Sequence, residues 1–231
     1  MEYNPKDSLN LATHGFPVGH RLAGLEEEVI QLQAVGNLFY TRGWSVGTSS
    51  NYSIITDREP LELIVTASGK DKGHLLVEDF VRINGDGLPV IPDQPKSSAE
   101  TLLHVVAAKM FPGVGAVLHT HSPWATLLSD RFFDQGSVTF SGYEMLKGLS
   151  GITTHETTYE LPIFENTQDI PVLAEQVEKW LSGPLPEYGA HGYLIRKHGL
   201  YAWGKDVAEA LRHIEIYEFL LECTGRQLLL R

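Results

Sequence analysis

The stretch AVLHTHSP, residues 116–123, combines a short apolar run with the start of a helix. Its first five residues form a short, largely apolar run that is typical of a buried strand. Ser122 and Pro123 then have the residue types preferred at the N-cap and the first position of a helix. A buried strand that passes directly into a helix predicts a fold of the α/β or α+β class.

Two histidines stand at the end of this strand. Side chains at positions i and i+2 project from the same face, so the imidazoles of His119 and His121 can meet at one ion. A catalytic zinc site needs a third neutral ligand, and His198 is the best placed, because it follows the β-rich residues 192–197 and precedes Gly199, which permits a close turn. The alternative is a pair of hydrogen-bonded histidines without a metal.

Local patterns before this stretch predict one helix and two hairpins. Apolar residues at helical spacing indicate a helix over residues 25–40. The first hairpin pairs residues 51–56 with 61–67, and the second pairs 80–83 with 88–91 across a turn rich in Asn, Asp and Gly. Four strands are therefore expected ahead of the one that carries the histidine pair.

Further helix signals occur on both sides of that strand. Capping-box spacing predicts a helix from Ser97 and a C-terminal helix from Asp206, and residues 192–203 are rich in β-formers. No repeat, linker or low-complexity segment divides the chain. Residues 1–231 are therefore expected to form a single domain, with residues 1–24 as an N-terminal extension.

Composition and charge exclude several classes of function. The chain has 231 residues and a formal net charge of -11, with no run of Lys or Arg, which disfavours nucleic-acid binding. Its one cysteine, Cys223, excludes a disulfide within one subunit and favours a reducing, cytoplasmic compartment. No export signal or apolar window long enough to span a membrane is recognised, so no membrane association is expected.

Two glutamates are candidates for acid–base chemistry. Glu100 is either the N3 acid of a capping box that starts at Ser97, or a carboxylate delivered to the metal from the start of a helix. Glu144 lies among apolar residues and glycines in residues 142–148, where burial would raise its pKa toward the range of a general acid or base. The alternative for Glu144 is a solvated surface glutamate.

Three polar, glycine- or serine-bearing segments have the character of phosphate-binding loops: residues 47–51, 66–70 and 96–98. None matches the Walker or the dinucleotide-binding pattern, which argues against nucleotide hydrolysis and dinucleotide binding. Each segment alone is more often a turn or a cap. Combined with a metal site, they indicate a small phosphorylated ligand.

The order of these motifs resembles the class II aldolase/epimerase superfamily of sugar-phosphate enzymes. The motifs are GTSSN at 47–51, TASG at 66–69, SSAE-x3-H at 97–104, H-x-H at 119–121 and KHG at 197–199. Within that superfamily the chain resembles the methylthioribulose-1-phosphate dehydratases, through SSAET at 97–101, HTHS at 119–122, EMLKG at 144–148, I-x-ENT at 163–167 and RKHG-x-Y-x-WG at 196–204. The resemblance covers about Leu25 to Cys223.

This resemblance implies a three-layer α/β/α subunit with a mostly antiparallel central sheet, assembled as a homotetramer. It also implies a lyase of methionine salvage that removes water from 5-methylthioribulose 1-phosphate to leave 5-methylthio-2,3-dioxopentyl 1-phosphate. The ligands of one zinc ion per subunit carry over to His119, His121 and His198, and the catalytic carboxylate carries over to Glu144.

The same resemblance assigns the substrate phosphate to Asn51, Ser68, Gly69, Ser97 and Ser98. The aldolases place their catalytic glutamate directly after the serine pair, whereas here Ala99 intervenes. The resemblance therefore favours Glu144 as the catalytic group and leaves Glu100 as a secondary carboxylate.

Two alternatives to the dehydratase share parts of this pattern. A class II aldolase or epimerase that acts on another sugar phosphate would use the same metal and phosphate sites. A non-catalytic interaction domain on the same fold, like the adducin head, would not need the three histidine ligands that this chain has.

Overall fold

The computed structural model describes residues 15–230, except residues 18 and 186. The α-helices in this part of the chain are α2 (Glu26–Thr41), α3 (Thr101–Met110), α4 (Pro123–Arg131), α5 (Ile170–Leu181) and α6 (Val207–Leu229). The strands are β1 (Asn51–Arg58), β2 (Leu61–Thr66), β3 (Phe80–Asn84), β4 (Ala116–Thr120), β5 (Ser137–Ser141), β6 (Thr158–Phe164), β7 (Gly192–Ile195) and β8 (Gly199–Gly204).

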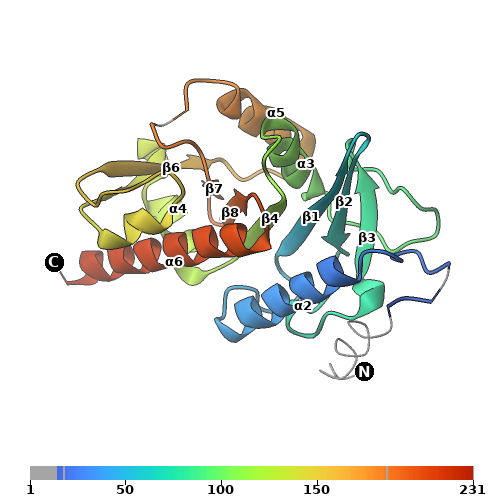
Figure 1. Ribbon diagram of the computed structural model, residues 1–231. Helices are drawn as coiled ribbons and strands as arrows, with labels where there is room; N and C mark the ends of the chain where they lie inside the picture. Colours follow the sequence, from blue (N-terminus) through green and yellow to red (C-terminus); the bar gives the residue numbers. More distant parts are fainter. Residues whose placement is uncertain (1–14, 18, 186, 231) are drawn as a thin grey trace.

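The strands form one sheet in the order β3-β2-β1-β4-β8-β7-β6-β5 (Figure 1). Neighbouring strands are antiparallel, except that β6 pairs with β7 in parallel. Strand β4 is therefore central, between β1 and β8, and all five of its residues are buried. The mostly antiparallel sheet expected from the resemblance is confirmed.

The two faces of the sheet are covered by different helices. In Figure 1, α2 and α6 lie below the sheet, and α3 and α5 lie above it. Alternate residues of β4 divide between these layers: Ala116 and Leu118 belong to the core that includes α2 and α6, whereas Val117 belongs to the core that includes α3 and α5. The three-layer α/β/α architecture is confirmed.

Most of the elements expected from local signals are present. Helix α2 and the hairpin of β1 and β2 lie where periodicity and turn residues predict them. Ser122 is the N-cap of α4, where its Oγ accepts a hydrogen bond from Ala125 N at 3.1 Å. Asp206 is the N-cap of α6 and accepts from Glu209 N at 2.8 Å. The caps of α4 and α6 are thus readable directly from the sequence.

The second predicted hairpin is only partly correct. Its turn is present, since Asn84 Oδ1 accepts hydrogen bonds from the backbone N–H groups of Asp86 and Leu88. Residues 88–91 form a single isolated bridge, Ile83 to Pro89, and not a strand. Prolines lack the N–H that a ladder needs, and the side chain of Gln94 accepts from Arg82 N at 2.9 Å where a further strand would pair.

The described part of the N-terminal extension packs against the rest of the chain. Leu22 is fully buried in the core, and the Arg21 guanidinium donates to the backbone oxygens of Glu78, at 2.9 Å, and Phe80. Residues 1–14 of that extension lie outside the described residues. Over the part of the chain that the structure describes, no helix has both the length and the apolar composition needed to cross a membrane.

Candidate metal centre

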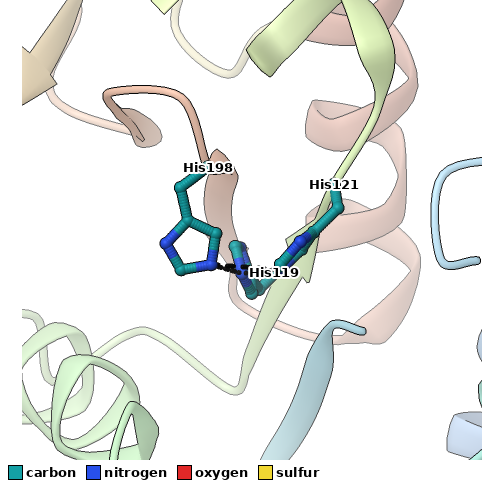
Figure 2. A group of neighbouring side chains, drawn as sticks. All are labelled: His119, His121 and His198. Carbon is teal, nitrogen blue, oxygen red and sulfur yellow. Dashed lines mark hydrogen bonds between the residues drawn. The ribbon is translucent and has the colours of Figure 1, made fainter. Parts of the chain in front are cut away.

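The three histidines proposed as metal ligands come from two neighbouring strands. His119 lies in β4, His121 directly follows it, and His198 lies in the turn between β7 and β8. Strand β8 pairs with β4, which brings the turn beside the end of β4. Gly199 makes this approach possible, because a Cβ there would overlap the backbone oxygen of Thr120. Figure 2 shows the three rings converging.

The imidazole nitrogens are spaced as ligands of one ion. The Nε2 atoms of His119 and His121 lie 2.8 Å apart, those of His121 and His198 lie 3.1 Å apart, and those of His119 and His198 lie 3.3 Å apart. A tetrahedral zinc ion with Zn–N distances of about 2.0–2.1 Å holds its nitrogens about 3.3 Å from one another. The cluster therefore fits a small divalent cation with little adjustment.

Hydrogen bonds hold the ring of His119 and the backbone of His121 and His198 in place. Nδ1 of His119 donates to the backbone oxygen of Leu200 at 2.9 Å, which leaves the lone pair of its Nε2 directed at the other two rings. The backbone N–H of His121 donates to Trp44 O at 2.7 Å, and the hydroxyl of Thr126 donates to His198 O at 3.0 Å. Each ligand is therefore held by a contact that does not involve the ion.

Burial keeps these histidines uncharged. Desolvation is the largest cause that lowers the pKa of each one: well below its usual range for His119, and to about 3 for His121. It also lowers the pKa of His198, and repulsion between the imidazolium forms lowers the first two further. A neutral imidazole is the form that binds a metal, so the electrostatics agree with the geometry.

Glu100 also reaches this cluster. Its Oε1 lies 3.3 Å from Nε2 of His198 and its Oε2 lies 3.9 Å from Nε2 of His119, with 22% of the side chain exposed. Helix α3 begins at Thr101, and the Glu100 side chain makes no capping hydrogen bond to it. The capping-box interpretation of Glu100 is therefore wrong, because the carboxylate turns away from the helix and toward the histidines.

A chain of hydrogen bonds holds Glu100 from behind. Asn51 Nδ2 donates to Glu100 Oε2 at 2.8 Å, Nε2 of His104 donates to Asn51 Oδ1, and the hydroxyl of Ser53 donates to Nδ1 of His104 at 2.8 Å. Tyr201, which stacks on His119, also donates to Glu100 Oε2 at 3.4 Å. Burial lowers the pKa of His104 to about 3, so this chain is neutral up to the carboxylate.

Sequence reasoning did not find this chain of contacts. The one local signal is that Glu100 and His104 are four residues apart, a spacing that places two side chains on the same face of a helix. The partner of both residues, Asn51, lies in a strand that precedes them by about fifty residues, and no local pattern links the three.

Behind the ligands, β4 is held from the opposite layer. Thr120 points away from the histidines, and its hydroxyl donates to Glu218 of α6 at 2.7 Å. Glu218 is buried, and desolvation raises its pKa to about 7. The end of β4 is therefore fixed from both of its faces.

Glu144 lies in a different setting. It begins the 3₁₀ helix η4 (Glu144–Gly148), and 67% of its side chain is exposed. Its carboxylate is ion-paired with Lys147 and lies 3.2 Å from Nδ1 of His155. The hydrogen bond from Lys147 is the main cause that lowers the Glu144 pKa. The expectation that burial raises this pKa is therefore wrong. Within the described chain, none of its polar contacts reaches the three histidines.

The three segments expected to bind phosphate lie together. Backbone N–H of Ser68 donates to Lys96 O at 2.9 Å, and Ala67 forms an isolated bridge with Ser97. The ammonium of Lys72 donates to the backbone oxygens of Thr48 and Lys70. Segments 47–51, 66–70 and 96–98 therefore share one region, although the amide of Asn51 is already engaged by Glu100 and His104.

Comparison with known proteins identifies the family and the fold. The model of the family described as "Class II Aldolase and Adducin N-terminal domain" matches residues 30–224. Among solved structures, a putative aldolase/epimerase/decarboxylase, YgbL from Escherichia coli, has a TM-score of 0.71 at 21% identity and covers 85% of this chain and 87% of its own. An L-fuculose 1-phosphate aldolase has a TM-score of 0.68 at 20% identity, with 86% and 85% covered. These structures share the fold.

Relatives of higher sequence identity indicate one family within this superfamily. A protein of Picosynechococcus named methylthioribulose-1-phosphate dehydratase is 47% identical over 86% of this chain and 91% of its own length. A protein of the same name from Xanthomonas campestris is 46% identical over 93% of this chain and 96% of its own. The second of these matches spans 218 residues, so it includes the part of the chain that contains the three histidines. The chain therefore belongs to the class II aldolase superfamily and, within it, to the methylthioribulose-1-phosphate dehydratase family.

Proposed function

We propose that this protein is a zinc-dependent hydro-lyase that converts 5-methylthioribulose 1-phosphate to 5-methylthio-2,3-dioxopentyl 1-phosphate and water in methionine salvage. The observation that carries the proposal is the convergence of three neutral imidazoles beside a carboxylate, in a chain whose relatives bear the name of this activity.

The metal is assigned to His119, His121 and His198 because their nitrogens fit one ion and their rings are uncharged. When bound, a divalent cation at this point polarises the C2 carbonyl of the substrate and stabilises negative charge on its oxygen. Three neutral ligands leave the full charge of the ion available for this purpose. Imidazole ligation favours zinc among the common divalent ions.

Glu144 is assigned the proton transfers. The carboxylate takes the proton from C3 and then delivers it to the hydroxyl that leaves C4, so that one molecule of water departs and an enol remains, which tautomerises to the diketone. Glu144 is exposed, and among the described residues its recorded ion pairs are with Lys147 and His155, so it is assigned to a site shared with a neighbouring subunit. The homotetramer proposed from the resemblance supplies such a neighbour.

Glu100 is assigned the orientation of the substrate beside the metal ligands. Its Oε2 accepts hydrogen bonds from Asn51 and Tyr201, whereas its Oε1 faces His198. Once His198 binds a metal, its Nε2 carries no proton, and Glu100 Oε1 becomes a free acceptor for a hydroxyl of the sugar. Ser68, Gly69, Ser97 and Ser98 are assigned to the phosphate, which anchors the reacting carbons at a distance.

Product analysis tests the proposal. Purified protein is loaded with zinc and incubated with 5-methylthioribulose 1-phosphate, and metal content and product mass are measured together. We expect stoichiometric zinc and a product lighter than the substrate by one water. Cleavage of a carbon–carbon bond would identify an aldolase, and inversion of a stereocentre without loss of water would identify an epimerase, so either result contradicts the proposal.

A further inference from the structure

Lys72 is a buried cation between two of the segments assigned to the phosphate. It begins the 3₁₀ helix η1 (Lys72–His74), and only 1% of the residue is exposed. Its Nζ donates to the backbone oxygen of Lys70 at 2.7 Å and to that of Thr48 at 3.4 Å. The ammonium therefore lies where segments 47–51 and 66–70 meet.

This charge has no carboxylate partner at ion-pair distance among the described residues. The neighbouring Asp79 is paired instead with Lys70, at 2.7 Å. An ammonium has three N–H donors, and the two carbonyl contacts account for only two of them. A buried charge is costly unless an opposite charge compensates it. The third donor is therefore available to an anion, since no carboxylate of the described chain lies at ion-pair distance from Nζ.

The charge of Lys72 interacts with groups of the metal centre. Desolvation lowers the pKa of Lys72 to about 8, while Asp79, Asp71 and Glu100 act to raise it, so the side chain is mostly cationic at neutral pH. The charge of Lys72 also contributes to the lowered pKa of His121. Lys72 therefore interacts electrostatically with Glu100 and with His121.

The backbone that carries Lys72 is fixed by helix α2. At Gly36 of α2, a Cβ would overlap the backbone oxygen of Lys72, so the helix and η1 approach as closely as two backbones can. Gln33 donates to Leu75 O at 2.8 Å, and Asp71 Oδ1 accepts from Gly73 N at 2.9 Å. The backbone position of Lys72 is therefore fixed by the packing of α2 against η1.

We propose that Lys72 binds the phosphate of the substrate through its remaining N–H donor and so neutralises that anion beside the metal centre. This inference rests on the proposed function, which requires a phosphorylated sugar in this region. A dianion is a ligand that compensates the charge of a buried ammonium with a free N–H donor, and the net charge of -11 leaves the rest of the chain unattractive to phosphate.

The test measures the binding of inorganic phosphate to the zinc-loaded protein by calorimetry, and also the phosphate-dependent rise of Tm. Lys72→Met removes the charge and the donor, whereas Lys72→Gln removes the charge and keeps an N–H for the carbonyls of Thr48 and Lys70. We expect both variants to bind phosphate about 10- to 100-fold more weakly, as for loss of a hydrogen bond from a charged group. Lys109→Met, an exposed lysine at the end of α3, is the matched control and should bind as the unmodified protein does.

Kinetics with the phosphorylated sugar separate this role from a structural one. Loss of a phosphate contact should raise KM about 10-fold or more while kcat changes less, and Lys72→Arg should recover part of the loss. Phosphate binding by Lys72→Gln that equals that of the control overturns the inference, as does absence of phosphate binding to the unmodified protein. If no dehydration is observed, the proposed function fails, and the calorimetric comparison still decides the role of Lys72.

Discussion

Glu100 is 22% exposed and accepts hydrogen bonds from Asn51 and Tyr201, whereas Glu144 is 67% exposed and is paired with Lys147 and His155 on the surface of its own chain. The first carboxylate is positioned by the interior of the subunit, on a chain of neutral groups that ends at Ser53. The second carboxylate, that of Glu144, has no recorded polar contact with the metal ligands among the described residues of its own subunit. The role implied by the family and the contacts within one subunit thus point to different carboxylates, Glu144 and Glu100.

The largest expected effect concerns the cluster next to Glu100. His198→Ala removes one of three ligands from a partly exposed turn, so zinc content should fall far below stoichiometric and turnover should be lost. Metal analysis and circular dichroism of the purified variant check this, with His155→Ala as a surface histidine for comparison of metal content. Full zinc content in His198→Ala would mean that the third ligand lies elsewhere.

Glu144→Gln should lower kcat by about 10²- to 10⁴-fold, because an amide cannot accept the C3 proton. Since the side chain is exposed, Tm and zinc content should stay as in the unmodified protein. Steady-state kinetics with metal analysis checks both. Turnover close to normal would remove Glu144 from the acid–base role.

Glu100→Gln tests the other carboxylate, which lies beside the metal ligands. We expect a loss of kcat of about 10- to 100-fold together with weaker zinc binding, as for other groups that support metal ligands. Zinc competition with a chelator gives the affinity. A change in kcat larger than that of Glu144→Gln would instead make Glu100 the principal carboxylate.

Mixed assemblies test whether Glu144 acts across subunits. Glu144→Gln and His198→Ala subunits are refolded together at equal amounts, so that about one quarter of the sites should combine intact ligands with an intact Glu144 of the neighbour. The activity of the mixture should then exceed the sum of the two separate variants. A simple sum would place Glu144 in the site of its own subunit or outside catalysis.

The smallest effects on activity and stability are expected from substitutions of residues that hold each carboxylate in place. Ser53→Ala removes a buried donor to His104 and should lower the free energy of unfolding by about 1–3 kcal/mol, with a modest loss of kcat. Lys147→Ala removes an exposed ion pair and should leave Tm unchanged within error. Thermal denaturation of both variants provides the measurement. Equal losses of Tm would mean that the two settings are not as different as their burial indicates.

Local chemistry made much of the fold predictable. Strand β4, the caps Ser122 and Asp206, and the hairpin of β1 and β2 all follow from short patterns. Strand β6 was not predicted, because Pro162 interrupts its pattern. That proline is tolerated because the ladder to β7 begins only at Ile163.

The site was predictable only in part, because local patterns indicate some of its residues and tertiary packing determines the others. The spacing of His119 and His121 is a local signal, so two ligands could be inferred from one strand, and Gly199 pointed to His198. The direction of the Glu100 side chain and the burial of Lys72 depend on Asn51, Thr48 and helix α2, which are distant in sequence. Contacts of that kind arise from tertiary packing, which one sequence does not display.

Strand β4 presents His119 to the layer of α3 and α5 and Thr120 to Glu218 in the layer of α6. A strand alternates with a period of two, so one inserted or deleted residue within 116–120 would exchange these two sets of side chains. The imidazole would then point into the hydrophobic layer and the hydroxyl toward the sugar. Such a length change would abolish metal binding even in a protein that still folded, whereas loops elsewhere can vary in length without this penalty.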